Sequence, residues 1–140
     1  MSFFRHTARI LVAWLALAPL AALADANTGL PATVDSDGGT FRLALKPLRS
    51  PVPFNELFEL QVDVSLLRKL DDPNPLWLSL DATMPGHGHG MNTHARIDGP
   101  DKGRFIVRGL LLHMSGEWEL SFEVAKGRTH EKAKLRFVLE

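Results

Sequence analysis

The feature that most constrains the fold of this chain is an alternation of apolar and polar residues that recurs along most of its length. In residues 58–64 an apolar side chain stands at every even position, with Glu59, Gln61 and Asp63 between them. Successive side chains of a β-strand point to opposite faces, so this pattern buries one face and leaves the other in water. Such runs lie at 41–46, 58–64, 76–84, 105–107, 118–124 and 133–139, and a shorter extended piece lies at 93–97.

Turns separate these seven runs and indicate the fold class. Residues that favour turns, mainly Gly, Pro, Asn and Asp, mark the connections at 71–75, 98–100 and 126–128. Seven short strands in about 100 residues are typical of an immunoglobulin-like sandwich. We therefore predict an all-β fold, a seven-stranded antiparallel immunoglobulin-like β-sandwich, with a small Greek-key β-barrel as the alternative.

The N-terminal residues have the pattern of a secretory signal. Two arginines precede an apolar run from Ile10 to Leu23, which ends in the small-residue pattern Ala-Leu-Ala. The run is about 14 residues long, shorter than the ~20 that span a bilayer as a helix. We predict a cleavable signal peptide at 1–24, a flexible lead-in at 25–39 and one domain at 40–140, soluble in the periplasm after cleavage.

Composition narrows the classes of partner. The chain has sixteen basic and sixteen acidic residues, and the signal peptide holds two of the basic ones and no acid. The remaining domain is slightly acidic and has no basic block, which argues against nucleic acid and anionic membrane surfaces as partners. The chain also has no cysteine, so no thiolate is available to a metal.

Histidine and methionine are concentrated in one glycine-rich segment. Residues 84–94 read Met-Pro-Gly-His-Gly-His-Gly-Met-Asn-Thr-His. Imidazole binds several transition metals and thioether favours Cu(I), so this set points to copper before zinc. An extended backbone would turn His87, His89 and Met91 to one side, and the glycines between them would let the loop wrap closely around an ion.

A second pair, His113 and Met114, follows the fifth predicted strand. If the strands alternate in direction, the third and fifth run the same way, and the loops after them lie at one end of the sandwich. This requires 93–97 to be a strand. Met84 stands at an inward-facing position of the third predicted strand, so it also fits the core. His130 is expected in a solvated turn. The predicted metal ligands are His87, His89, Met91, His113, Met114, His94 and Met84.

Three segments carry a family resemblance. Residues 84–92, then Gly103-Arg104-Phe105, and then the run His-Met-Ser-Gly-Glu-Trp-Glu-Leu at 113–120 together resemble the YtkA-like domain family. These are small exported or membrane-tethered β-sandwich domains, related to FixH-type accessory proteins. The resemblance covers roughly residues 41–139. It implies a sandwich fold and a link to copper handling or oxidase assembly.

The sequence favours a periplasmic metal-binding protein that holds copper, as Cu(I), for delivery or sequestration. Its partner would be a copper donor or acceptor protein, or a membrane complex. The alternative is a non-metal interaction module that docks on a membrane complex or transporter through the same Gly/His loop. We do not expect an enzyme, because no nucleophile motif occurs and no acid between Met84 and Ile97 could serve a zinc hydrolase.

Overall fold

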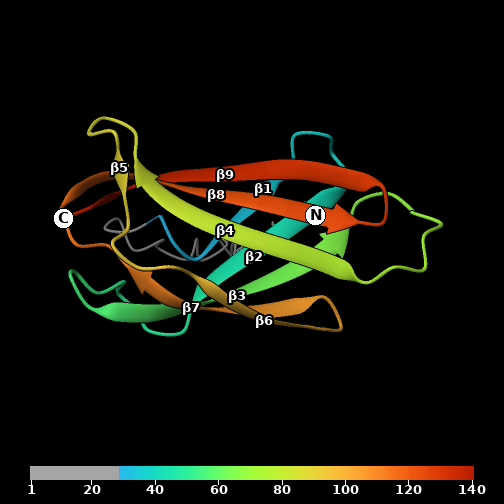
Figure 1. Cartoon of the computed structure of the whole chain (residues 1–140), viewed down its shortest axis with the longest axis horizontal. Coiled ribbons are helices and arrows are strands. Elements are labelled where there is room, and N and C mark those ends of the chain that lie inside the picture. Colours follow the sequence, from blue (N-terminus) through green and yellow to red (C-terminus); the bar gives the residue numbers. More distant parts are fainter. Residues whose placement is uncertain (1–28) are drawn as a thin grey trace, which may run out of the picture.

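The computed structural model describes residues 29–140, which form nine β-strands and no helix (Figure 1). The all-β prediction is therefore confirmed for this part of the chain. The predicted signal peptide and residues 25–28 lie outside the described residues. The strands are β1 (Ala32–Asp35), β2 (Phe41–Pro47), β3 (Leu57–Leu66), β4 (Leu76–Met84), β5 (His89–Gly90), β6 (Arg96–Asp101), β7 (Arg104–Leu111), β8 (Gly116–Lys126) and β9 (Thr129–Leu139).

The strands form two antiparallel sheets. One sheet has the order β1-β2-β3-β7-β6, and the other has the order β5-β4-β8-β9. The prediction of seven strands is wrong, since the described residues hold nine. Strand β1 lies inside the predicted lead-in and pairs with β2, and β5 is only two residues long and pairs with the end of β4. Alternation cannot indicate strands this short, because four or two residues hold too little of the pattern.

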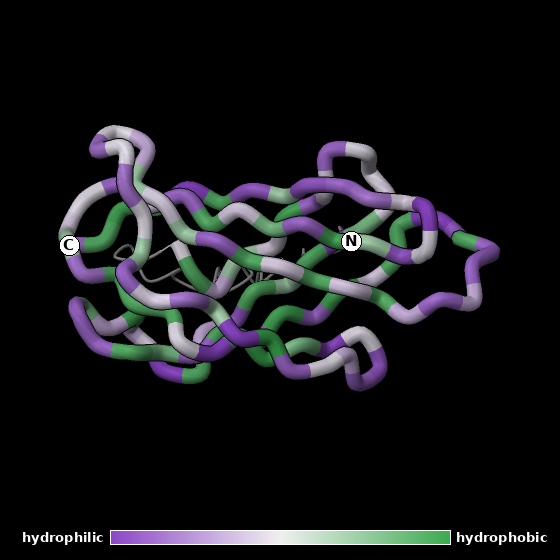
Figure 2. Tube along the Cα trace, viewed as in Figure 1, coloured by the Kyte–Doolittle hydropathy of each residue, from purple (hydrophilic) through white to green (hydrophobic). Residues whose placement is uncertain are grey.

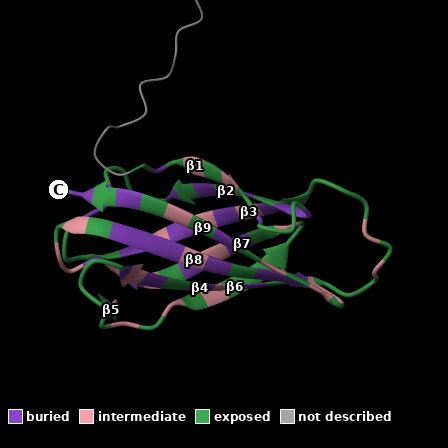
Figure 3. Cartoon of the chain, turned by 90° about the horizontal axis from the view of Figure 1, so that it is seen from above, coloured by how far each residue is buried: buried purple, intermediate pink, exposed green. Residues whose placement is uncertain are grey.

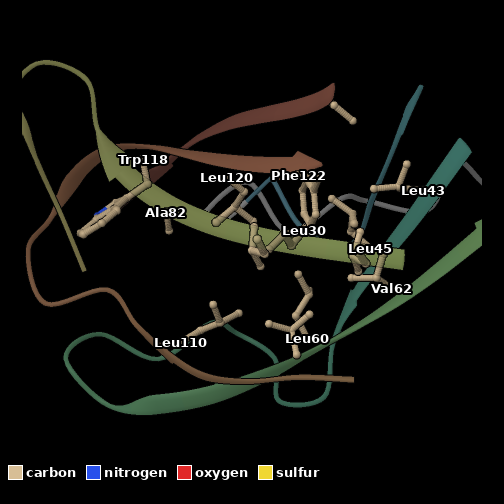
Figure 4. Close-up of a cluster of buried hydrophobic side chains, with 14 of the residues drawn as sticks. Leu30, Leu43, Leu45, Leu60, Val62, Ala82, Leu110, Trp118, Leu120 and Phe122 are labelled. Atoms are coloured by element: carbon tan, nitrogen blue, oxygen red, sulfur yellow. The ribbon is translucent and has the colours of Figure 1, made fainter. Parts of the chain in front are cut away.

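The core lies between the two sheets. On β2, Phe41, Leu43 and Leu45 are buried while the residues between them are exposed, as the alternation predicts. A similar change between hydrophobic and hydrophilic residues runs along β3 and β4 (Figure 2), and it follows the change between buried and more exposed residues (Figure 3). Inward side chains from both sheets meet in one cluster, which includes Leu60, Leu110, Trp118 and Phe122 (Figure 4).

A carboxylate on β9 joins that strand to the turn between β1 and β2. Glu131 accepts hydrogen bonds from the Ser36 hydroxyl at 2.5 Å, from the Thr40 backbone N–H at 3.0 Å and from the Thr40 hydroxyl. The guanidinium of Arg68 lies 3.4 Å from the same carboxylate. Burial raises the pKa of Glu131, but these donors outweigh burial and hold the pKa below its ordinary value. Glu131 is therefore an ionised link between sheets.

A second carboxylate is covered on the outer face of the smaller sheet. Glu119 lies between the inward residues Trp118 and Leu120 of β8, yet it is only 6% exposed. Lys134 and Arg136 on β9 cover it, and each donates a hydrogen bond of 2.7 Å to it. These hydrogen bonds lower the pKa of Glu119 to about 2.

The short extended piece predicted at 93–97 is shifted in the structure. The strand there, β6, begins at Arg96 and pairs with β7 at one edge of the larger sheet.

No helix long and apolar enough to cross a membrane occurs between residues 29 and 140.

Candidate metal centre

The two segments that carry His and Met meet at one end of the molecule. Residues 85–95 follow β4 and contain β5, whereas residues 112–115 join β7 to β8. Strands β4 and β7 both run toward the end where β9 also finishes, at the left of Figure 1. The loops after these two strands therefore share one end, as the topological prediction requires.

His87 lies in a turn at the tip of the first segment. The backbone N–H groups of His87 and Gly88 both donate to the carbonyl oxygen of Met84, at 3.0 and 3.1 Å. The backbone is therefore bent here, and the extended spacing assumed for His87, His89 and Met91 does not hold. The exposed imidazole of His87 still lies near His89, with ring centroids 5.6 Å apart.

His89 contacts the second segment directly. It begins β5, where it pairs with Met84, and Gly90 follows it. A Cβ atom at Gly90 would lie 2.9 Å from the carbonyl oxygen of Ala82, so glycine is what lets β5 approach β4 this closely. The pairing places His89 Nε2 3.2 Å from the Sδ atom of Met114. This contact joins the two predicted halves of the site.

His113 lies on the inner side of this pair and is partly buried. Its ring centroid is 5.9 Å from that of His89 and 5.8 Å from that of Trp118, whose ring meets it edge-on. The Nδ1 atom of His113 is buried and has no hydrogen-bond partner within the described part of the chain. A buried polar atom without a partner costs about 1–3 kcal/mol. The lone pair or proton on this nitrogen is therefore available to a ligand.

Trp118 has a role that the sequence did not indicate. The alternation assigns it to the core, and it is indeed fully buried. Its indole Nε1–H, however, also donates a hydrogen bond of 2.9 Å to the carbonyl oxygen of Met114. The position of Trp118 four residues after Met114, across a short turn, was the only available signal. The indole therefore fixes the backbone that carries the Met114 thioether.

The side chains of the other three predicted ligands have different surroundings. Met91 is partly buried, and its Sδ atom accepts a hydrogen bond of 3.4 Å from the backbone N–H of Leu111, so it packs between the loop and β7. Met84 is fully buried in the core. His94 is exposed beside an open hollow of about 460 Å³. Among residues 29–140 it has no hydrogen bond or ring contact with the other histidines.

We call His87, His89, His113 and Met114 the His/Met cluster. Metal–nitrogen and metal–sulfur bonds of about 2.0 and 2.3 Å place two ligand atoms about 3.5 Å apart on a tetrahedral ion. The 3.2 Å between His89 Nε2 and Met114 Sδ is close to that separation. No group of three or more His, Asp or Glu side chains in residues 29–140 is placed to hold a metal ion. The close pair of donor atoms at this end is one imidazole nitrogen and one thioether sulfur.

Comparisons of this chain with protein-family models, with curated proteins and with solved structures found no match. The resemblance to YtkA-like domains therefore remains a prediction from the sequence.

Proposed function

We propose that this chain is an exported protein that binds Cu(I) at the His/Met cluster and holds it for delivery or sequestration in the periplasm. The observation that carries the proposal is the 3.2 Å contact between His89 Nε2 and Met114 Sδ. It joins a nitrogen and a soft sulfur donor from two loops that are 25 residues apart in the sequence.

The chemistry of the donors favours copper over zinc. Structural and catalytic zinc sites use imidazole, thiolate and carboxylate ligands. The chain has no cysteine, and the close pair at this end contains a thioether, which selects Cu(I) among the common biological ions. His113 adds a third donor atom, a second nitrogen, on the inner side of the pair, and His87 adds an exposed imidazole at the rim.

The exposure of the cluster fits exchange of the ion with another molecule. The side chains of His87 and His89 are exposed, whereas His113 and Met114 are partly buried. An ion held here is reachable from outside, as transfer to or from a copper donor, acceptor or membrane complex requires. We also infer the finer fold, an immunoglobulin-like β-sandwich of the YtkA-like kind, from the two sheets around one core and from the three resembling segments.

An anaerobic titration with Cu(I) against a chromogenic chelator tests the proposal. The purified chain should remove copper from the chelator, and the variant His89→Gln/Met114→Leu should lose at least tenfold in affinity. The matched control is His130→Gln/Met91→Leu, which changes the same residue types outside the cluster. It should bind copper as the original chain does.

Two results would overturn the proposal. One is failure of the unaltered chain to compete with the chelator. The other is equal loss of affinity in the cluster variant and in the control. In the first case the Gly/His loop would be better explained as a docking surface for a protein partner.

A further inference from the structure

Most of one edge of β4 is open. Strand β4 has nine residues, and β5 pairs only with its last two (Figure 1). The carbonyl oxygen of Ala82 accepts the N–H of Met91 at 3.1 Å, so Ala82 directs its backbone groups to this edge, away from β8. Residues two apart in a strand direct their backbone groups to the same edge, so Leu78 and Leu80 also face it. Among residues 29–140 the N–H and C=O groups of Leu78 and Leu80 have no hydrogen-bond partner on this edge.

The side chain of Asp81 and a hollow border the open edge. Asp81 Oδ1 accepts the N–H of Ala82 at 2.9 Å, and within the described part of the chain this exposed carboxylate forms no ion pair. The open hollow of about 460 Å³ beside His94 has Leu80, Asp81 and Thr83 of β4 on one side and residues of the segment 90–95 on the other. The edge therefore borders a space that a further strand can enter.

The other three sheet edges are protected against a further strand. Strand β1 has only four residues, and β6 contains Pro100 within a shift of register. On β9 the N–H and C=O groups of Lys132 already bond to Asp37. Short strands, proline, bulges and lysine are the usual protections of an exposed edge. Strand β4 has none of them, and Asp81 is its single charged residue.

We propose that β4 accepts an extended segment of a partner protein as a further antiparallel strand, beside Leu78 and Leu80 and in line with β5. Backbone hydrogen bonds to the open N–H and C=O groups hold the segment, as in other cases of strand addition. This inference goes beyond the proposed copper function and does not depend on it.

The side chains around the edge define the chemistry of the segment. Asp81 carries the only formal charge at neutral pH among the residues that line the hollow, so a lysine or arginine of the segment is favoured beside it. Met91 and Ala95 line the same hollow and pack against the core, which favours apolar side chains on the inward face of the segment. Successive side chains of a strand point to opposite faces. The segment that fits therefore alternates apolar and basic residues.

Hydrogen–deuterium exchange of single backbone amides, followed by NMR, tests whether the edge is open. In the purified chain the amides of Leu78 and Leu80 should exchange at least tenfold faster than that of Ser79, which faces β8. Ser79 is an internal control, because it lies between the other two in the same strand. Equally slow exchange at all three residues would overturn the proposal, since the edge would then be covered by another part of the chain or by a second copy.

A synthetic peptide in which valine and lysine alternate is the probe for the occupant. It should slow the exchange of Leu78 and Leu80 at least tenfold, and a peptide of alternating valine and glutamate should bind at least tenfold more weakly. The valine and lysine peptide with every second backbone nitrogen methylated keeps the side chains but cannot pair, so it should have no effect. No slowing by the unmethylated peptide, or equal slowing by both forms, would overturn strand addition.

Asp81→Asn tests the charge beside the edge. The amide keeps an oxygen for the Ala82 N–H and removes the negative charge, so the affinity for the valine and lysine peptide should fall at least threefold. The matched control is Asp101→Asn, an exposed carboxylate on the edge strand β6, which should bind the peptide as the unaltered chain does. Equal loss in both variants would overturn the placement at β4. Chelator competition should give the same Cu(I) affinity in all three chains, so this proposal and the copper function fail separately.

Discussion

The indole Nε1–H of Trp118 donates a hydrogen bond of 2.9 Å to the carbonyl oxygen of Met114, and this bond connects the hydrophobic core to the His/Met cluster. Trp118 is fully buried between the sheets, so its position is set by core packing. Met114 lies in a short connection that has no strand pairing of its own. The core thus determines where the thioether of Met114 meets His89.

Replacement of Trp118 by Phe removes this hydrogen bond and keeps an aromatic ring in the core. We expect Cu(I) affinity to fall about fivefold, which corresponds to the ~1 kcal/mol of one hydrogen bond. Chelator competition measures the affinity, and urea unfolding measures the accompanying loss of stability. Phe122→Leu is the control, because it disturbs the core without touching Met114. If both variants weaken copper binding equally, Trp118 acts through general stability alone.

Met84 and Met114 should respond differently to the same substitution. Met84 is fully buried in the core, so Met84→Leu should leave Cu(I) affinity within twofold of the original value. A swap of this kind conserves volume and should cost less than about 1.5 kcal/mol of stability. Met114→Leu should instead lower the affinity at least tenfold, because its sulfur contacts His89. Loss of copper binding in Met84→Leu would place the ion deeper than we propose.

Glu119 should make the stability of the fold depend on pH in acid. Hydrogen bonds from Lys134 and Arg136 lower its pKa to about 2, from an ordinary value of 4.5. A carboxyl group whose pKa is lower in the folded state stabilises the fold above the ordinary pKa, and this contribution is lost as pH falls toward the folded value. Glu119→Gln should therefore lower the free energy of unfolding by about 1–2 kcal/mol at pH 7. Thermal unfolding at pH 7 and near pH 2 measures this difference, which should nearly vanish in acid. A difference that is the same at both pH values would contradict this account.

Glu131 should be the most sensitive polar residue of the fold. Its carboxylate accepts hydrogen bonds from Ser36 and Thr40, so Glu131→Ala leaves the buried Thr40 hydroxyl without its acceptor. We expect a loss of about 2–3 kcal/mol in urea unfolding. Lys132→Ala, its exposed neighbour on β9, should change stability by less than about 0.5 kcal/mol. Equal effects of the two substitutions would show that the link from β9 to the turn contributes nothing.

The alternation of residues predicted the core well, for a physical reason. A strand that faces the core on one side places apolar residues at every second position, as Phe41, Leu43 and Leu45 do. Strands β1 and β5 were not predicted because they are too short to show an alternation, and each is held by pairing with a neighbouring strand. β1 pairs along β2, and β5 depends on the close approach that Gly90 allows to Ala82.

The candidate site was predictable only in part. The residue types and the topology indicated that the two His/Met segments share one end, and the contact between His89 and Met114 agrees with this. The extended interpretation overlooked the turn signal of Pro85-Gly86, and the sequence could not indicate that the Met91 sulfur faces the backbone of Leu111. That contact depends on how the loop packs against β4 and β7. The hydrogen bond from Trp118 to Met114 could not be predicted either. A tryptophan in the core is expected from its apolar ring, and its N–H can still donate a hydrogen bond at the edge of the core.

The most direct test of the central claim is X-ray absorption spectroscopy of the Cu(I)-loaded chain at the copper edge. If His89 and Met114 bind the ion, the spectrum should show sulfur scatterers near about 2.3 Å together with nitrogen near about 2.0 Å. Met114→Leu should remove the sulfur contribution and keep the nitrogen. A spectrum of the unaltered chain with nitrogen and oxygen scatterers alone would contradict the mixed imidazole and thioether site.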